Sequence, residues 1–360
     1  AADLLGGRVS PGTPLVKAID EAIELGVVKA SRQAVEDMRE QAASRGETVN
    51  DVDIFRELVG LYKKQPNLGS RTSTSVAQQA YSTPAPLAFL ASHLAGVTKE
   101  TSVYEPTAGN GMLLIEASTE NAVVNELNSE RAGRLRSLGF DVTENDAAEY
   151  LPKNRVDVVV ANPPFGRVRD DGGNAKAWTV GDFTTNELDH AIVMQALQAL
   201  KPEGRAVLII GGKQGEDQTR SDKYHAGPQR RFYAELFDNY KVTDHFTVDG
   251  KLYERQGAGY PIDFIVIEGR GKTEGRKFPA AQLPRIYSSF EQLEELINDR
   301  PTISKQDLGT TERVASADAA TSGGMEERGD TGRPVVSGSK QAAGTDSGGG
   351  RTGGVRAVSP

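Results

Sequence analysis

The sequence of 360 residues predicts an α/β protein with a mainly parallel sheet, a helical N-terminal extension and a disordered C-terminal tail. Short apolar stretches alternate with amphipathic ones over residues 75–300, which is typical of βαβ units. Residues 13–63 carry apolar side chains three and four positions apart, as helices do. From Ser316 onward 11 of 45 residues are Gly, and no aromatic residue follows Phe290, so too little apolar surface is available to order this segment.

The individual elements follow from the same patterns. Asn50 or Asp51 is expected to cap the helix that begins DVDIFREL. The expected strands are Ser102–Glu105, Ala122–Glu126, Val156–Ala161, Ala206–Ile210, Val242–Val248 and Asp263–Glu268. The expected helices of the main region are Pro86–Leu94, Gly111–Thr119, Ser129–Leu138, Leu188–Leu200 and Phe290–Asn298. We therefore expect a helical extension over 1–70, one α/β domain over 71–300 and a disordered Gly/Ser-rich tail or linker over 301–360.

Composition excludes several classes of protein. The 42 basic and 50 acidic side chains give a net charge of −8, which argues against coating nucleic acid by bulk charge but allows a local basic cleft. Without Cys there is no disulfide framework, thiolate zinc site or Cys nucleophile, and four scattered His leave little for a metal site. No apolar stretch reaches the roughly 20 residues that span a bilayer, and the N-terminus lacks a signal-peptide layout. We expect a cytoplasmic protein without metal, and either a processed product or a piece of a longer chain, since Met is not the first residue.

The segment SVYEPTAGNGMLLIEA reads as a strand, a turn and a helix. Glu105 ends the strand, and Gly109 and Gly111 permit a tight turn with close approach of a ligand to the backbone. A helix beginning there would offer free N–H groups. The dinucleotide pattern G-x-G-x-x-G is incomplete, so a turn that merely packs remains the alternative.

Two further acids follow at strand ends. Glu126 closes AVVNE, where a carboxylate can accept hydrogen bonds from both hydroxyls of a ribose. A surface strand that simply ends in an acid is the more common alternative. Asp146 follows the strand-like FDVTE and could accept a hydrogen bond from an adenine amine, or act with Asn145 as a plain helix cap.

The most specific pattern is Asn162-Pro163-Pro164-Phe165 at the carboxyl end of the strand VDVVVA. The ligands of open α/β sheets bind at this end. Two prolines give a rigid turn without N–H groups, so the backbone carbonyls are free to accept. The Asn162 amide oxygen, the Pro163 carbonyl and the Phe165 ring together predict a slot for a planar group that bears an NH₂.

These residues resemble the (Asn/Asp)-Pro-Pro-(Tyr/Phe) motif of class I S-adenosylmethionine-dependent amino-methyltransferases. Glu105–Gly111 resembles their cofactor loop, and QQAYSTPAPLAFLAS is similar to the segment before that loop in N6-adenine DNA methyltransferases. The resemblance covers about residues 75–270 and implies a class I (Rossmann-like) methyltransferase sheet with helices on both faces, S-adenosyl-L-methionine as cofactor and adenine N6 in DNA as substrate. It implies these cofactor-binding residues: Tyr81, Thr83, Pro84, Glu105, Thr107, Ala108, Gly109, Asn110, Gly111, Glu126, Leu127, Asp146, Ala147 and Asn162. It implies Asn162, Pro163, Pro164 and Phe165 as the catalytic slot.

The order of the motifs is similar to the gamma class of these enzymes, in which a target-recognition domain follows the catalytic half. Here only one expected helix and the tail follow Glu268. The segments EPTAGNG and NELN also resemble those of methylase modules in mobile-element and phage proteins. We therefore expect DNA as a partner, with a recognition domain or helicase supplied by the same longer polypeptide or by another protein.

Two basic stretches, residues 166–180 and residues 211–233, are candidates for contacts to DNA. The candidate residues are Arg167, Arg169, Trp178, Lys213, Arg230 and Arg231. Solvated loop charge is the plain alternative for the basic side chains, and anchoring in the core is the alternative for Trp178. By the same resemblance, Leu188–His190 is a candidate for the lining of the cofactor pocket. Tyr260–Pro261 is a candidate for contact with a base that has been flipped out of duplex DNA.

Other functions remain open on the sequence. Methylation of protein glutamine, as in release-factor methyltransferases, uses a similar Asn-Pro-Pro-Tyr-type motif. Amino-methylation of guanine or adenine in RNA is a further alternative. Outside enzymes, the fold could serve as a scaffold that binds DNA or a partner. The Tyr81–Pro84 segment and Phe165 in place of Tyr favour nucleic acid, and the complete slot and glycine turn favour an enzyme.

Overall fold

The computed structural model describes residues 14–68, 82–169, 172–257 and 259–299. In this part of the chain an eight-stranded sheet has the order β10-β8-β9-β7-β4-β1-β2-β3. Strand β9 runs antiparallel to β7 and β8, and the other neighbours are parallel. The strands are β1 Val103–Glu105, β2 Ala122–Asn125, β3 Val142–Thr143, β4 Val156–Ala161, β7 Leu200–Gly211, β8 Tyr240–Val248, β9 Ile262–Arg270 and β10 Arg285–Tyr287.

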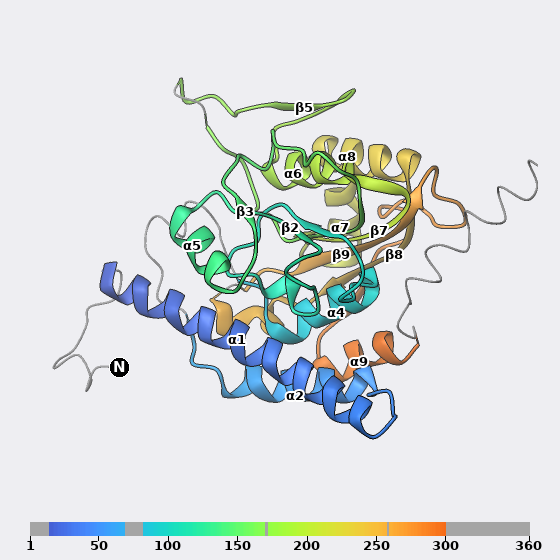
Figure 1. The fold of residues 1–360 in the computed structure, drawn as a ribbon. Helices are drawn as coiled ribbons and strands as arrows, with labels where there is room; N and C mark the ends of the chain where they lie inside the picture. Colours follow the sequence, from blue (N-terminus) through green and yellow to red (C-terminus); the bar gives the residue numbers. More distant parts are fainter. Residues whose placement is uncertain (1–13, 69–81, 170–171, 258, 300–360) are drawn as a thin grey trace, which may run out of the picture. The chain divides into compact units, whose positions relative to one another are not determined.

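Helices cover both faces of this sheet (Figure 1). Alternation along β4 explains the layering, because Val158 and Val160 join one core while Val159 and Ala161 join the other. The first core packs against α1, α2, α4, α5 and α9, and the second against α6 and α8. The helices are α1 Pro14–Ser44, α2 Asp51–Lys64, α4 Ala85–Ala95, α5 Ser129–Ser137, α6 Leu188–Leu197, α7 Asp217–His225, α8 Gly227–Asn239 and α9 Phe290–Asn298.

Helix α4 is enclosed by the N-terminal helices and the sheet. All of its residues are buried, which fits its almost wholly apolar sequence APLAFLASHLA. Helices α1 and α2 cover it, and Val28, Phe55 and Leu58 belong to the same core as α4. Asn50 caps α2 by accepting a hydrogen bond from the Val52 N–H, as one of the two expected caps.

All six expected strands are present, and Val156–Ala161 has the expected bounds. The expected helices at Pro86–Leu94, Ser129–Leu138, Leu188–Leu200 and Phe290–Asn298 are present as well, with small shifts at their ends. Strand β7 is longer than expected, since it begins at Leu200 where the expected helix was to end.

The expected helix Gly111–Thr119 is wrong. The chain forms only a 3₁₀ turn, η1, over Met112–Leu114. All three of its side chains are buried, so this segment lacks the polar face of a surface helix. The Arg32 guanidinium of α1 donates hydrogen bonds to the carbonyls of Leu114 and Ala117. A helix that continued through this segment would need these carbonyls as acceptors for its own hydrogen bonds.

Several elements were not expected. The second basic stretch is not a loop, because it forms α7 and α8, and Tyr224, Phe232 and Tyr233 point into the core. Arg220 is also buried and donates to the Pro284 carbonyl. The first basic stretch ends in strand β5 Trp178–Val180, which pairs with β6 Phe183–Thr185 in a small antiparallel hairpin. A 3₁₀ segment, η2, spans Gly250–Gln256.

Some expectations fall outside the described part. Tyr81 and residues 301–360, the expected tail, belong to the ranges that the structure does not describe. Among the helices that it does describe, none combines the length and apolar character needed to cross a membrane.

Candidate active site

A cavity of about 870 Å³ lies at the carboxyl ends of β1, β2 and β4 and brings the sequence motifs together. This is the edge at which open α/β sheets bind their ligands. The predicted residues that line it are Thr83, Glu105, Thr107, Ala108, Gly109, Asn110, Glu126, Leu127, Asp146, Ala147, Asn162, Pro163, Pro164 and Phe165. Pro84 and Gly111 do not line it. Pro84 precedes the first turn of α4, and Gly111 lies behind the turn that the cavity contacts.

Glu105 is the most unusual group in the cavity. Its side chain is 2% exposed, and no described group donates to its Oε2. Burial, and secondly the charge of Glu126, raise the pKa of Glu105 well above its ordinary value. A buried carboxylate without a partner is costly unless a ligand supplies a donor or a positive charge, so this group indicates a cationic or protonated ligand group. The nearby Thr107 hydroxyl is also buried without a described partner.

The glycine turn has the left-handed backbone that the sequence suggested. Gly109 has φ +58° and Gly111 has φ +86°, a region that favours glycine. A Cβ at Gly111 would lie 2.8 Å from Leu135 Cδ2 of α5, whereas a Cβ at Gly109 would meet nothing within 4 Å. Gly111 therefore allows α5 to pack against the turn, and Gly109 leaves space in front of it.

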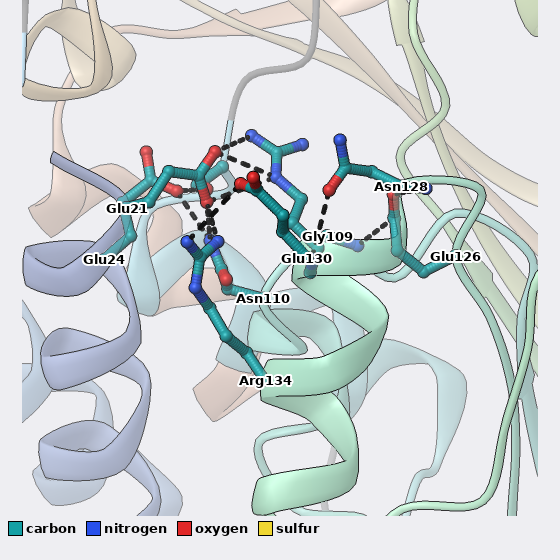
Figure 2. Close-up of polar contacts among 10 residues, drawn as sticks. Glu21, Glu24, Gly109, Asn110, Glu126, Asn128, Glu130 and Arg134 are labelled. Atoms are coloured by element: carbon teal, nitrogen blue, oxygen red, sulfur yellow. Dashed lines mark hydrogen bonds and ion pairs between the residues drawn. The ribbon is translucent and has the colours of Figure 1, made fainter. Parts of the chain in front are cut away.

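Glu126 is tied to this turn by backbone hydrogen bonds (Figure 2). Its Oε2 accepts from the Gly109 N–H at 2.8 Å and its Oε1 from the Asn128 N–H at 2.9 Å. Burial raises the pKa of Glu126 although these two donors oppose the rise. Each carboxylate oxygen can accept more than one hydrogen bond, so the side chain keeps capacity for hydroxyl groups in the cavity.

Asp146 both lines the cavity and caps a turn. Its Oδ1 accepts from the Ala148 N–H at 3.0 Å, and its Oδ2 lies 3.6 Å from Lys176 Nζ. Asp146 therefore caps a turn, and the helix that the capping alternative required does not form there. Trp178 packs behind this turn with Ala147, Ala148 and Ile192 and is only 5% exposed. Its burial favours the alternative that Trp178 anchors this segment in the core.

The Asn162 side chain has a defined orientation. Its Nδ2 donates to Thr83 Oγ1 at 2.9 Å and to the Tyr253 hydroxyl at 3.3 Å. Because the amide nitrogen is engaged in this way, the Oδ1 atom is the part left for a ligand, and no described group donates to it. Pro163, Pro164 and Phe165 line the cavity beside it, and Phe165 also packs against the core.

Two residues that the sequence analysis missed organise these motifs. Tyr253, in η2, is buried and completes the pocket for the Asn162 amide. Asn125 is fully buried and joins three segments, because it donates to the Pro106 and Asn145 carbonyls and accepts from the Asn145 N–H. Asn125 stands beside Glu126 in the pattern VNELN, and a polar residue within an apolar strand was the available signal. Nothing near Tyr253 in the sequence marks it.

Most of the basic candidates lie away from the cavity. Of the six residues proposed for DNA, only Arg167 lines it, and its guanidinium pairs with Glu187 at 2.7 Å. Arg169 donates to the Gly173 carbonyl, and Lys213 to the Gly211 carbonyl. Arg230 and Arg231 are exposed on α8.

The candidates for the cofactor pocket and the base also differ in whether they line the cavity. Leu188, Tyr260 and Pro261 line the cavity, and Tyr260 is 68% exposed. His190 instead stacks on Phe232 with ring centroids 4.0 Å apart. Burial lowers the pKa of His190 to about 3, so the ring is neutral and packs. Among the described residues, no group of His and acidic side chains could hold a metal ion.

No protein-family model and no curated protein sequence matches this chain. Solved structures similar to it include a protein described as a modification subunit of a type I restriction enzyme from Vibrio vulnificus, at 17% identity and a TM-score of 0.42. That match covers 76% of this chain and 60% of the subunit, so this chain spans well under the subunit's full length.

Two smaller proteins are also similar. One, from Listeria monocytogenes, is described as a class I S-adenosylmethionine-dependent methyltransferase, with 12% identity, a TM-score of 0.41 and coverage of 78% of this chain and 97% of that one. The other, from Pyrococcus horikoshii, is described as an RNA methyltransferase, with 20% identity, a TM-score of 0.40 and coverage of 62% and 98%.

The strand order confirms the expected α/β architecture. In the described part of the chain, β3-β2-β1-β4-β7-β9-β8 form a mainly parallel sheet in which β9 runs antiparallel, with helices on both faces. Strand β10 extends this sheet by pairing in parallel with β8.

Proposed function

We propose that this chain transfers a methyl group from S-adenosyl-L-methionine to the exocyclic N6 amine of adenine in DNA. The orientation of Asn162 is the observation that carries the proposal. Its amide nitrogen is held by Thr83 and Tyr253, and its amide oxygen remains as an acceptor beside the Pro163 carbonyl and the Phe165 ring. An acceptor pair next to an aromatic ring suits a planar base that bears an NH₂ group.

The residues of the cavity fit the cofactor. Its volume of about 870 Å³ is within the usual range for a cofactor site and leaves room for part of a base. The unpartnered Glu105 Oε2 would accept from the ammonium group of the methionine moiety, Glu126 from the ribose hydroxyls and Asp146 from the adenine amine. When bound, S-adenosylmethionine would supply the methyl group from its positively charged sulfur, the S–CH₃ bond would break to leave neutral S-adenosylhomocysteine, and the methylated amine would release one proton to water.

The chain's own contribution is to prepare the amine. The lone pair of an adenine N6 amine is delocalised into the ring, which makes the amine a poor nucleophile. Hydrogen bonds from its two N–H groups to Asn162 Oδ1 and the Pro163 carbonyl would draw the nitrogen toward tetrahedral geometry and free that pair. The same two oxygens stabilise the positive charge that develops on nitrogen. Alignment of the reactants alone can contribute about 7–11 kcal/mol.

A base in duplex DNA reaches this slot only if it leaves the helix, at a cost of a few kcal/mol. Phe165 would replace part of the lost stacking. Tyr260 is exposed at the cavity and could stack on the substrate outside the slot. Arg167, Arg169, Lys213, Arg230 and Arg231 remain candidates for contacts to phosphate, with Arg167 nearest the slot. A recognition domain or helicase, in the same polypeptide or in a partner, would supply sequence choice.

The test is transfer of labelled methyl groups to unmethylated duplex DNA, RNA and a protein extract in parallel. Label in DNA that digests to N6-methyladenine nucleoside is the expected result. Label in protein would point to glutamine methylation, and label in RNA alone would move the substrate to RNA, so either would contradict the proposal. A protein that binds no cofactor at all would leave only the scaffold alternative and would contradict the proposal.

Asn162→Ala is the matched variant for this assay. We expect it to bind cofactor within a few-fold of wild type, because the other cofactor contacts stay, and to lose methyl transfer by roughly 100-fold or more. Full activity in this variant would exclude the slot mechanism.

A further inference from the structure

Two glutamates of helix α1 reach the turn between Gly109 and Gly111 from outside the methyltransferase sheet (Figure 2). Glu21 is 6% exposed and accepts from Arg131 and Arg134 of α5 at 2.7 and 2.8 Å. Burial opposes ionisation of Glu21, but the two arginines and Asn110 lower its pKa. This side chain is therefore a fixed negative charge between the N-terminal helix and α5.

Asn110 connects these glutamates to the cavity. Its Nδ2 donates to Glu21 Oε2 at 3.1 Å and to Glu24 Oε2 at 2.8 Å. Asn110 is 3% exposed and lines the cavity, and its Oδ1 is buried with no described partner. The two glutamates thus decide which end of this amide is free, and they leave the oxygen as an unused acceptor.

Glu24 also holds the opposite side of the cavity. Its Oε2 accepts from the hydroxyl of Ser82, which lines the cavity next to Thr83. Thr83 in turn holds the Asn162 amide. Burial raises the pKa of Glu24, and its Oε2 accepts the hydrogen bonds from both Ser82 and Asn110. One side chain of α1 therefore contacts both the glycine turn and the segment behind the proposed slot.

We propose that helix α1 is part of the cofactor site, with Glu21 and Glu24 as positioning residues that hold Asn110 so that its Oδ1 accepts from the cofactor. This inference rests on the proposed function, and it adds a site component from outside the methyltransferase motifs. Coupling between two sites is reciprocal, so bound cofactor stabilises the packing of α1 to the same extent that α1 strengthens cofactor binding.

The first test measures the dissociation constant of S-adenosylhomocysteine by calorimetry for variants at position 24. Glu24→Leu keeps the side-chain volume but removes both oxygens, and it should weaken binding about tenfold. Glu24→Gln retains an acceptor oxygen and should bind within about threefold of wild type. In methyl transfer, Glu24→Leu should raise KM for the cofactor while kcat at saturation changes less.

The control lies on the same helix. Glu36 pairs with Lys99 at 2.7 Å, so it also joins α1 to the rest of the chain, but neither residue lines the cavity. Glu36→Leu should leave the affinity unchanged. Glu21 is less suitable for the first test, because its replacement leaves the guanidinium groups of Arg131 and Arg134 without this carboxylate. A loss of affinity in such a variant could then not be separated from a loss of stability.

A double-mutant cycle with Asn110→Ala then tests the route of the effect. If Glu24 acts through Asn110, the Glu24→Leu/Asn110→Ala double variant binds about as weakly as Asn110→Ala alone. Additive losses would overturn the positioning role, as would wild-type affinity in Glu24→Leu protein. Hydrogen exchange in residues 18–44 should slow when S-adenosylhomocysteine is added, and unchanged exchange would also count against the proposal. Wild-type protein that binds no cofactor would overturn the proposed function itself.

Discussion

At the scale of single residues, the candidate site is built from polar groups that lack partners. Glu105, Thr107 and Asn110 each have a buried oxygen that no described group satisfies. Such atoms cost folding free energy, since they give up water and gain no protein donor. Their common position around one cavity indicates that a bound ligand supplies the missing donors.

Glu105→Gln should stabilise the ligand-free protein and weaken cofactor binding. The folded-state pKa of Glu105 is raised, so its stabilising contribution is present below the ordinary value and is lost as pH rises through the raised pKa. The glutamine variant lacks this loss and should gain about 1–3 kcal/mol at the alkaline end of the range. Denaturant unfolding of both proteins between pH 5 and 9 measures the difference.

The pH dependence of cofactor affinity should have the opposite sign to the pH dependence of stability in this range. An ammonium group binds the ionised carboxylate, so wild-type affinity for S-adenosylhomocysteine should rise with pH until Glu105 is ionised or the ammonium loses its proton. The Glu105→Gln protein should show weak affinity throughout. Equal pH dependence in the two proteins would contradict the role assigned to Glu105.

Thr83→Val should lower kcat about tenfold with little change in the KM for cofactor, because it removes one of the two groups that orient the Asn162 amide. Steady-state methyl transfer measures both constants. Thr101→Val is the control: Thr101 is also buried, bonds within its own turn and does not line the cavity. An equal loss in the two variants would point to general destabilisation.

At the scale of elements, the glycine turn depends on its neighbours more than on its own sequence. Gly111 has a positive φ, which favours glycine. It must also lack a Cβ, because α5 packs against it. The segment after it is shorter than the expected helix, because Arg32 of α1 binds two of its carbonyls. The conformation of the turn is therefore set by two helices from different parts of the chain.

Gly111→Ala should cost about 1–3 kcal/mol of stability, since it combines positive φ with a close contact to Leu135. Gly26→Ala is the contrasting variant. Gly26 lies on the exposed side of α1 with nothing within 4 Å of a Cβ, so alanine there should stabilise by about 0.5–1 kcal/mol. Thermal unfolding of the two variants should shift in opposite directions, and a shared direction would refute this account.

At the scale of the molecule, the N-terminal helices and the sheet share a hydrophobic core. Val28 of α1 and Phe55 of α2 lie in the same cluster as Phe89 of α4 and Val158 of β4. Polar contacts cross the same junction, including the hydrogen bond between His93 Nδ1 and Asp51 at 3.0 Å and the partly buried ion pair of Arg39 with Glu116. This packing leaves no side of α4 exposed to water.

We therefore expect residues 14–299 to unfold in one transition. Trp178, the sole tryptophan, reports on the core beside α6, and far-ultraviolet circular dichroism includes the long helix α1. The two signals should change at the same denaturant concentration. A chain lacking residues 1–66 should be insoluble or unfolded, because α4 would lose its cover. Loss of helix signal before Trp178 fluorescence changes would contradict the prediction.

The sequence by itself determined the class of fold and predicted the groups of the proposed slot. Apolar periodicity is local, so it predicted all six expected strands, and the motif at Asn162–Phe165 specifies its groups within four residues. Only the tertiary structure decided the rest: Tyr253 beside Asn162, Asn125 between three segments, and Glu24 of α1 on Asn110. These contacts join residues 19 to 91 positions apart, and no spacing rule encodes them. The same limit explains the buried Trp178 and the missing helix after Gly111, since packing partners and not local composition decide both.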